Sequence, residues 1–258
     1  MDLNMRGKRV LITGGSKGLG LACAKAFLAE GAKVAISSRS AENLAAATKV
    51  LGDVLAIAAN LSDAEAAAEM VREVEAKLGP IDVLVNSAGA ARRAPPDELT
   101  PAKWRDAMDA KFFTYINVID PVVKLMAKRK TGVIINLNGV GGKIGTPTHL
   151  AGGAANAALM LVSAGLAVAY AKDGVRVVGI TPGLFKTERV RAGMAAEAKM
   201  MNVTVDEAMK HAESRVPMGR FGDPDEIGAM TVFLASDRAA YTTGSNITMD
   251  GAGSPTVM

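Results

Sequence analysis

The stretch TGGSKGLG at residues 13–20 decides the fold, because it joins a short apolar run to a helical pattern. The run KRVLIT (8–13) precedes it, and the pattern GLGLACAKAFLAEG (18–31) follows it. Glycines at this spacing allow a tight turn, a close approach of the backbone to a pyrophosphate, and close packing of helix on strand. The N-terminus of the helix then faces the phosphates. We therefore predict a dinucleotide-binding loop here, in preference to a turn with a purely structural role.

Apolar runs of strand length alternate with longer helical patterns along the rest of the chain. Further strands are predicted at 33–38, 54–60, 81–89, 132–138, 174–183 and 245–253, and further helices at 41–51, 63–79, 101–130, 149–172 and 223–236. Strands connected through helices run parallel, with right-handed crossovers. The sequence thus predicts a doubly wound, Rossmann-type α/β domain over residues 1–258, with about seven parallel strands and helices on both faces of the sheet.

The composition is that of a soluble globular protein, since 49% of the 258 residues are hydrophobic and 22% are charged. The net charge of +4 is modest, and the basic run KRK at 128–130 is interpreted as a solvated helix end rather than a nucleic-acid contact. A single cysteine, Cys23, excludes an internal disulfide and a cysteine-based zinc cluster, so no metal site is expected. No apolar run approaches membrane-spanning length, and MDLNMRGKRV (1–10) lacks the form of a signal peptide. We expect a cytoplasmic protein without nucleic-acid or membrane partners.

The second predicted strand ends in SSRS (37–40), which bears on the choice of dinucleotide. An acidic side chain at this point binds the ribose 2′-hydroxyl of NAD, whereas arginine accommodates the 2′-phosphate of NADP. Arg39 is the charged residue of this stretch, and Lys17 of the glycine loop can approach the same phosphate. We therefore predict NADP(H) rather than NAD(H), against the alternative that Arg39 is an ordinary surface residue.

Four motifs in the same order give the chain a full-length resemblance to the short-chain dehydrogenase/reductase (SDR) family. They are TGGSKGLG (13–20), NSAG (86–89), ITPG (180–183) and GRFGDPDEIGAMTVFLASDRAAYTTGSNITMDG (219–251). The resemblance implies a small-molecule substrate and a substrate-covering segment over 184–216. Together, the glycine loop, the strand ends and the resemblance assign cofactor binding to Gly14, Ser16, Lys17, Gly18, Leu19, Gly20, Ser38, Arg39, Asn60, Leu61, Asn86, Ser87, Ala88, Gly89, Asn156, Pro182, Gly183 and Thr187.

The same resemblance places the family's catalytic set on unexpected residues. Members of the family use a serine, a tyrosine and a lysine, together with an asparagine. The lysine ammonium lowers the pKa of the tyrosine, which exchanges a proton with the substrate oxygen. Aligned without a gap from the fifth strand to ITPG, the serine position falls on Gly139, the tyrosine on Gly152 and the lysine on Asn156. The asparagine position falls on Lys111, and Tyr170 lies too far along its helix to substitute for the tyrosine.

Two of these changes are reciprocal, since the asparagine has become Lys111 and the lysine has become Asn156. We hypothesise that Lys111 directs its ammonium into the vacated space, where a lowered pKa would let it act as an acid or a base. Asn156 would keep a neutral hydrogen bond to the nicotinamide ribose. The alternative is that Lys111 faces solvent or pairs with Asp106 or Asp109.

His149 and Asn138 complete the candidate catalytic residues. His149 precedes Gly152 by about one helical turn, so its imidazole can enter the space that the tyrosine has left, and histidine titrates near neutrality. Its alternative role is that of a capping or loop residue. Asn138 adjoins the lost serine and can donate a hydrogen bond to a substrate oxygen.

Three functions are compatible with this pattern. The first is an NADP(H)-dependent oxidoreductase with a rewired proton-transfer site, acting on a carbonyl or an alcohol. The second is a cofactor-retaining lyase or isomerase, and the third is a non-catalytic dinucleotide-binding protein. The resemblance also implies a homo-oligomer, a dimer or a tetramer, paired through the helices predicted at 101–130 and 149–172. Arg92 and Arg93, in the loop after NSAG, can meet an anionic substrate or remain ordinary exposed charges.

Overall fold

Seven parallel strands form the central sheet of the computed structural model, which describes residues 2–89 and 91–255. The strands are β1 (Arg9–Thr13), β2 (Lys33–Ser38), β3 (Leu55–Ala58), β4 (Val83–Asn86), β5 (Gly132–Leu137), β6 (Val175–Pro182) and β7 (Asn246–Met249). Their order is β3-β2-β1-β4-β5-β6-β7, and each neighbouring pair is parallel. From β1 the chain continues to β2 and β3 on one side, whereas from β4 it continues to β5 and β6 on the other side. Ligands bind at the carboxyl ends of the two strands where the order reverses in this way. The predicted doubly wound sheet is confirmed.

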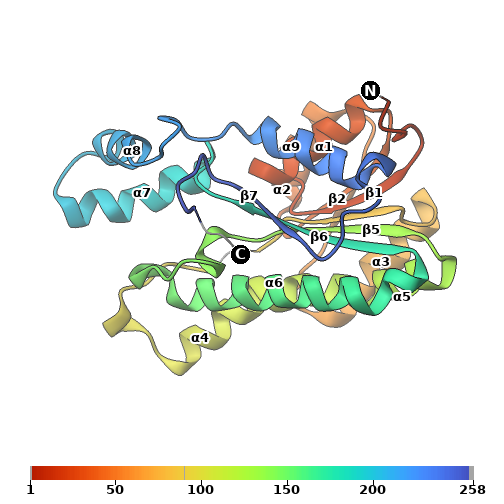
Figure 1. Ribbon diagram of the computed structural model, residues 1–258, viewed down its shortest axis with the longest axis horizontal. Helices are drawn as coiled ribbons and strands as arrows, with labels where there is room; N and C mark the ends of the chain where they lie inside the picture. The colour runs from red at the N-terminus through yellow and green to blue at the C-terminus, as the bar shows by residue number, and fades with distance from the viewer. Residues whose placement is uncertain (1, 90, 256–258) are drawn as a thin grey trace.

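Helices cover both faces of the sheet (Figure 1). One face carries α1 (Gly18–Ala29), α2 (Ala41–Leu51) and α9 (Pro224–Ala235), and the other carries α3 (Ala64–Leu78), α5 (Thr114–Arg129) and α6 (Leu150–Tyr170). Alternation along the strands supplies both cores, because successive side chains point to opposite faces. Val10 and Ile12 belong to the core under α1, α2 and α9, whereas Leu11 belongs to the core under α3, α5 and α6.

The helix predicted over 101–130 is not one regular α-helix. It consists of α4 (Pro101–Ala107), a π-helical turn (Met108–Phe113) and α5. The Thr114 hydroxyl donates to the Asp109 carbonyl oxygen, five residues back, at 2.9 Å, and so satisfies an acceptor where the regular pattern is interrupted. Such turns inside α-helices are frequent at functional sites. Lys111 lies on this turn and is buried.

The predicted substrate-covering segment, 184–216, folds largely into α7 (Glu188–Met201) and α8 (Val205–Ser214). These helices extend from the same end of the domain as α4, at the left of Figure 1. Met194 and Ala212 pack with Phe221 in a small core separate from the two cores of the sheet. The segment is therefore anchored by apolar contacts of its own, and its role over a substrate stays a prediction.

The helix α6 corrects the expectation that no apolar run of the chain approaches membrane-spanning length. With its flanking turns it forms a helical segment of 27 residues, Pro147–Asp173, which is long and apolar enough to cross a membrane. Length and composition are weak evidence, because core helices pass the same test. Here Leu159 and Ala167 lie on a buried face, whereas Leu161 and Val168 are exposed, and 33% of the most apolar window is buried. The helix is thus an element of the domain with one apolar face left open.

A chain of buried polar side chains links the strand ends at the carboxyl edge of the sheet. Thr13 Oγ1 donates to Asn86 Oδ1 at 3.4 Å, and Asn86 Nδ2 donates to Asn136 Oδ1 at 2.9 Å. Asn136 Nδ2 then donates to Ser163 Oγ on α6 at 2.9 Å. All four side chains are fully buried. Because a buried amide is costly unless it is hydrogen-bonded, this chain favours one arrangement of β1, β4, β5 and α6.

Candidate active site

Three glycines shape the loop between β1 and α1. A Cβ on Gly14 would lie 2.8 Å from the Ala88 Cα, and a Cβ on Gly20 would lie 2.3 Å from the Gly14 carbonyl oxygen. Gly14 and Gly18 also have positive φ values, +67° and +55°, which favour glycine. No side chain caps α1 at Lys17, so the first N–H groups of the helix remain available to an anion. The loop therefore fits the pyrophosphate of a dinucleotide.

The ends of β2 and β3 lie next to this loop. The Gly15 N–H donates to the Ser37 carbonyl oxygen at 3.2 Å, and the Ala59 N–H donates to the Ser38 carbonyl oxygen at 3.1 Å. These bonds place the residues after β2 and β3 along one edge of the glycine loop. The adenosine end of a dinucleotide whose pyrophosphate lies at α1 would extend in this direction.

The two cations predicted to bind a 2′-phosphate are both accessible. Arg39 follows β2 with an exposed side chain that forms no ion pair with a described residue. Lys17 approaches Glu188 at 3.6 Å, and both of these side chains are exposed. Ion pairs at this separation on a protein surface are weak, so Lys17 can exchange its partner for a phosphate.

Two further loops converge on the glycine loop. A Cβ on Gly89 would lie 2.3 Å from the Ala110 carbonyl oxygen, and Arg189 Nη1 donates to the Gly89 carbonyl oxygen at 3.3 Å. A Cβ on Gly18 would lie 3.6 Å from the Thr187 Cγ2. The remaining predicted cofactor residues belong to these loops and strand ends: Ser16, Leu19, Asn60, Leu61, Asn86, Ser87, Pro182 and Gly183. The structure thus brings the predicted cofactor residues together at one edge of the sheet.

Asn156 lies over Gly139, the residue at the predicted serine position. Its Oδ1 accepts a hydrogen bond from the Gly139 N–H at 2.9 Å, and a Cβ on Gly139 would lie 2.7 Å from its Nδ2. A serine at position 139 is therefore incompatible with this placement of Asn156. The bond uses the amide oxygen and leaves the Nδ2 hydrogens as donors for a ribose hydroxyl.

His149 lies beside Gly152, the residue at the predicted tyrosine position. A Cβ on Gly152 would lie 2.2 Å from the imidazole Cε1, and a Cβ on Gly141 would lie 2.9 Å from its Cδ2. The ring is therefore held between two glycines, and a larger residue at 152 would displace it. Its Nδ1 is buried without a hydrogen-bond partner among the described residues. The imidazole occupies the space beside residue 152, whereas its catalytic role stays a prediction.

The charge state of His149 follows from its surroundings. Burial lowers its pKa, and the positive charges of Arg93, Lys111 and Arg189 lower it further. The neutral imidazole is therefore favoured near neutral pH. A neutral imidazole offers one N–H donor and one nitrogen acceptor, so it can orient a substrate oxygen without carrying a charge.

Lys111 is turned into the protein from the π-helical turn. Its Nζ donates to the Tyr115 Oη at 2.7 Å and to the Leu137 carbonyl oxygen at 2.9 Å, and it lies 4.1 Å from the centre of the Tyr115 ring. Burial, and secondly the charge of Arg189, lowers the pKa of Lys111 to about 7. The amine is therefore divided between its two protonation states near neutral pH, as a general acid requires.

This geometry disagrees with both alternatives for Lys111, which were exposure to solvent and pairing with Asp106 or Asp109. The side chain is 8% exposed, and its hydrogen bonds go to Tyr115 and Leu137 rather than to Asp106 or Asp109. Sequence reasoning missed Tyr115, although its spacing of four residues from Lys111 on a helix was a usable signal. Tyr115 donates to the Leu137 carbonyl oxygen at 2.8 Å, and burial raises its pKa. It therefore remains a neutral phenol that holds the lysine in place.

Asn138 is turned away from this group. Its Nδ2 donates to Asn246 Oδ1 at 2.9 Å, and a Cβ on Gly179 would lie 2.9 Å from the same nitrogen. Its Oδ1 is buried without a partner among the described residues. This placement favours a link from the end of β5 across Gly179 to β7 over the predicted role as a donor to a substrate oxygen.

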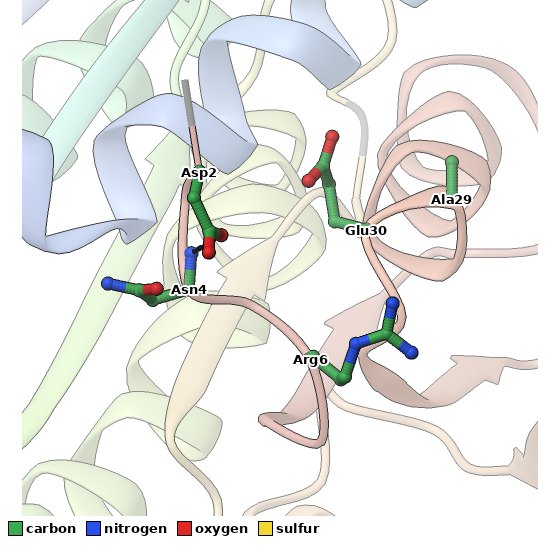
Figure 2. Close-up of a pocket in the computed structure, with 5 residues that line it drawn as sticks. All are labelled: Asp2, Asn4, Arg6, Ala29 and Glu30. Carbon is green, nitrogen blue, oxygen red and sulfur yellow. Dashed lines mark hydrogen bonds between the residues drawn. The ribbon is translucent and has the colours of Figure 1, made fainter.

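Two cavities lie outside the cofactor loops. One, of about 470 Å³, is lined by Asp2, Asn4, Arg6, Ala29 and Glu30 (Figure 2). These residues precede β1 and end α1, so the cavity is at the amino ends of the strands, opposite the loops that carry the site. The other, of about 230 Å³, lies between the 141–146 loop and the first turns of α6, with His149 in its wall.

Comparison with known proteins agrees with this geometry. The chain matches a family model described as enoyl-(acyl carrier protein) reductase over residues 14–253. Acetoacetyl-CoA reductase of Shinella zoogloeoides is 36% identical over 241 residues, which are 93% of this chain and 96% of the relative. The 3-oxoacyl-(acyl carrier protein) reductase of Thermotoga maritima is 33% identical over 253 residues, which are 96% of this chain and 98% of the relative.

Solved structures share the fold over nearly the whole chain. L-sorbose reductase from Gluconobacter frateurii, complexed with NADPH and L-sorbose, aligns with a TM-score of 0.91 at 30% identity, covering 97% of this chain and 98% of the other. An actinorhodin polyketide ketoreductase with NADPH aligns with a TM-score of 0.92 at 26% identity, covering 95% of this chain and 97% of the other. The named relatives are all reductases.

The contact between residue 152 and His149 can be tested by a double-mutant cycle. We expect Gly152→Ala to destabilise the protein by about 1–3 kcal/mol, because the added Cβ displaces the imidazole. In a His149→Ala background the same change should be neutral or stabilising by up to about 1 kcal/mol, since alanine favours a helix over glycine. Urea unfolding of the four proteins measures the coupling free energy.

Gly165→Ala is the matched control on α6, because nothing lies within 4 Å of the added Cβ. Its effect should be the same in both backgrounds. Equal effects of Gly152→Ala with and without the imidazole would contradict the placement of His149.

Proposed function

This chain belongs to the short-chain dehydrogenase/reductase family, and we propose that it is an NADP(H)-dependent oxidoreductase with an altered proton-transfer site, acting on the carbonyl or alcohol group of a small molecule. The observation that carries the proposal is the set of close backbone contacts around the glycine loop (13–20) and the NSAG loop (86–89), which we call the dinucleotide cradle. A Cβ on Gly14, Gly20 or Gly89 would collide with backbone atoms, so the glycine loop, the NSAG loop and the π-helical turn meet only with glycine at these positions. Two solved structures with this fold contain NADPH, which supports the choice of cofactor.

Different residues of the cradle would bind different parts of the cofactor. The N-terminus of α1 would hold the pyrophosphate, and Arg39 and Lys17 would pair with the 2′-phosphate. Asn156 would donate from Nδ2 to the nicotinamide ribose, since its Oδ1 is used by Gly139. NADPH supplies the hydride when it is bound.

Lys111 would supply the proton. When a carbonyl carbon accepts a hydride, the oxygen keeps the electron pair of the broken π bond and takes a proton from the Lys111 ammonium. The neutral amine left behind then regains a proton from solvent. Because burial lowers the pKa of Lys111 to about 7, both states are populated near neutrality and the cycle can close. His149, which is neutral, would orient the substrate oxygen from the place of the family's tyrosine.

Loss of the family's tyrosine is compatible with turnover. A general acid contributes about 10²–10⁴-fold to a rate. Holding the hydride donor and acceptor together contributes an effective molarity on the order of 10⁵ M or more. Cofactor and substrate binding therefore account for more of the acceleration than the phenol does, and a less well-placed acid still leaves a working enzyme.

Cofactor specificity can be tested at Arg39. We expect Arg39→Ala to weaken NADPH binding about 10–100-fold and to leave NADH binding within about twofold, because NADPH alone carries the 2′-phosphate. Fluorescence titration with each dinucleotide measures the affinities. Lys33→Ala, at the exposed other end of β2, is the matched control and should change neither. Equal affinity of the unmodified protein for NADH and NADPH would contradict the specificity, and binding of neither would contradict the whole proposal.

The role of Lys111 can be tested by the pH dependence of reduction. With the unmodified protein, kcat/KM should fall as the pH rises through about 7, because the ammonium that donates the proton is lost from the protein without substrate. Lys111→Met should lower kcat about 10²–10⁴-fold and remove this pH dependence. The measurement is NADPH consumption with the best substrate of a carbonyl panel.

Lys124→Met is the control for this experiment, because Lys124 is an exposed lysine of α5 that pairs with Asp120. It should leave kcat and the pH profile of kcat/KM unchanged. A Lys111→Met protein with unaltered kcat and NADPH affinity would remove Lys111 from both proton transfer and cofactor binding.

A protein that binds a dinucleotide without catalysis is a second candidate, favoured by the way Asn156 and His149 fill the site. The family's set can be restored with Gly139→Ser, Gly152→Tyr and Asn156→Lys, combined with His149→Ala to clear the place of the tyrosine. Activity that arises only after restoration would favour the non-catalytic protein, whereas activity that falls would favour the rewired site. Substrate loss without a change in NADPH absorbance would indicate a lyase or an isomerase.

We further propose that two copies of this chain pair through α5 and α6. Leu161 and Val168 are 76% and 83% exposed on the outer face of α6, and a continuous apolar face of this kind is normally covered. Oligomers paired through these helices are what the family resemblance implies. We propose that a second copy, rather than lipid, covers this face of α6, because we expect a cytoplasmic protein.

Introducing charges at this face should separate the copies. We expect Leu161→Asp with Val168→Asp to give a monomer, because like charges repel and desolvating unpaired charges opposes association. Size-exclusion chromatography with light scattering gives the mass. Val50→Asp on α2, at a position 61% exposed, is the matched control. A monomeric unmodified protein, or an unchanged oligomer in the double variant, would contradict the pairing.

A further inference from the structure

Cations from three separate segments lie near enough to His149 to act on its imidazole. Arg93 lies in the loop after β4, Lys111 on the π-helical turn and Arg189 on α7. All three act on the imidazole of His149, whose pKa they lower after burial has done so. Segments far apart in the sequence therefore direct positive charge to one point.

Hydrogen bonds fix the segments that carry these cations. The Ala94 N–H donates to the Thr148 carbonyl oxygen at 3.1 Å, which holds the Arg93 loop against the turn before His149. Arg189 Nη1 donates to the Gly89 carbonyl oxygen at 3.3 Å, which holds the start of α7 over the NSAG loop. The Arg93 loop and the start of α7 are thus both fixed to segments of the candidate site.

Among the side chains that the structure describes, no carboxylate pairs with these three cations. No ion pair within 4.0 Å joins Arg93, Lys111 or Arg189 to a described acidic side chain. The nearest acid along α7, Glu188, approaches Lys17 at 3.6 Å instead. A guanidinium has five N–H donors, and the contact with Gly89 uses one of those on Arg189. Donors and positive charge are therefore left for a ligand.

We propose that the substrate of this site is an oxo acid, whose carboxylate is bound by Arg93 and Arg189 while its carbonyl faces Lys111 and His149. Arginine binds carboxylates through paired, charge-assisted hydrogen bonds, and a cleft of one charge sign concentrates ligands of the opposite sign. The proposal rests on the proposed function, because the carbonyl is the group to be reduced.

A substrate carboxylate would also help to supply the proton. A negative charge close to Lys111 favours its ammonium form, so binding raises the amine's affinity for a proton. Reduction then proceeds with the proton already in place: the hydride goes to the carbonyl carbon, the ammonium proton goes to the carbonyl oxygen, and the products are a hydroxy acid and NADP⁺. The anionic substrate would offset part of what the missing tyrosine and lysine do in the family.

Binding of a substrate carboxylate can be tested without turnover in the NADP⁺-loaded protein. The oxidised cofactor has no hydride to transfer to a ketone. The probes are 2-oxobutyrate, acetoacetate and levulinate, each with its methyl ester, and acetonylphosphonate, all titrated by calorimetry. We expect at least one acid to bind about tenfold or more tightly than its ester. Arg93→Ala and Arg189→Ala should each remove that preference and leave ester binding within about twofold.

Arg92→Ala and Arg191→Ala are the matched controls, one beside each arginine. Arg191 pairs with Asp206 at 3.0 Å, and Arg92 is exposed next to Arg93. Both should leave the preference for the acid intact. Equal binding of every acid and its ester, no acid bound at millimolar concentration, or Arg93→Ala and Arg189→Ala proteins that keep the preference would each overturn the proposal. Tighter binding of acetonylphosphonate than of every acid would overturn the choice of a carboxylate.

Proton uptake gives a second readout that does not depend on activity. At about pH 8 the amine of Lys111 is mostly neutral, so binding of an acid should take up a proton, seen as a dependence of the binding heat on the buffer. Lys111→Met should abolish that uptake. NADP⁺ affinity is measured beforehand without acid, and the titrations are repeated on cofactor-free protein. Failure of cofactor binding and failure of acid binding are then separate results.

Discussion

The close approach of backbone to backbone at the carboxyl ends of β1 and β4 is the constraint on which the rest of the site depends. Gly14 lies against Ala88, and Gly89 lies against Ala110, at distances that leave no room for a Cβ. Repulsion between atoms is steep at such separations, so one added methyl group would push the loops apart. Beneath them, the buried hydrogen bonds from Thr13 through Asn86 and Asn136 to Ser163 hold the strand ends in one arrangement. The cradle, the lysine and the imidazole all take their positions from this framework.

The space beside Gly139 and Gly152, the predicted serine and tyrosine positions, is filled by other side chains. Asn156 occupies the space of a side chain at 139, and the His149 ring occupies the space of a side chain at 152. Two adjacent glycines near the start of a helix cost about 1 kcal/mol each relative to alanine. Here they permit contacts that alanine would prevent, since a Cβ on Gly153 would lie 2.7 Å from the Gly141 carbonyl oxygen. The changes therefore form matched pairs, in which each glycine makes room for a particular neighbour.

Electrostatics connects these pairs to the chemistry. An ammonium in a protein interior loses its hydration, which favours the neutral amine unless an acid lies beside it. Lys111 has instead a phenol and a carbonyl oxygen as partners, with Arg189 as a neighbouring charge. The family places its lysine beside a tyrosine to favour loss of the phenol proton. In this chain the tyrosine neighbour of Lys111 is fully buried, and because burial raises its pKa it stays protonated.

The amino-acid sequence by itself determined the alternation of strands and helices and the glycine loop, and it predicts that the family's four catalytic positions hold Lys111, Gly139, Gly152 and Asn156. These follow from periodicity and spacing, which are local properties of the chain. Only the tertiary structure decided the π-helical turn, the direction of Asn138 toward Asn246, and the contact of Arg189 with Gly89 across 100 residues of sequence. The reason is physical: the direction of a side chain depends on which atoms pack around it, and those atoms come from segments whose proximity is set by the completed sheet.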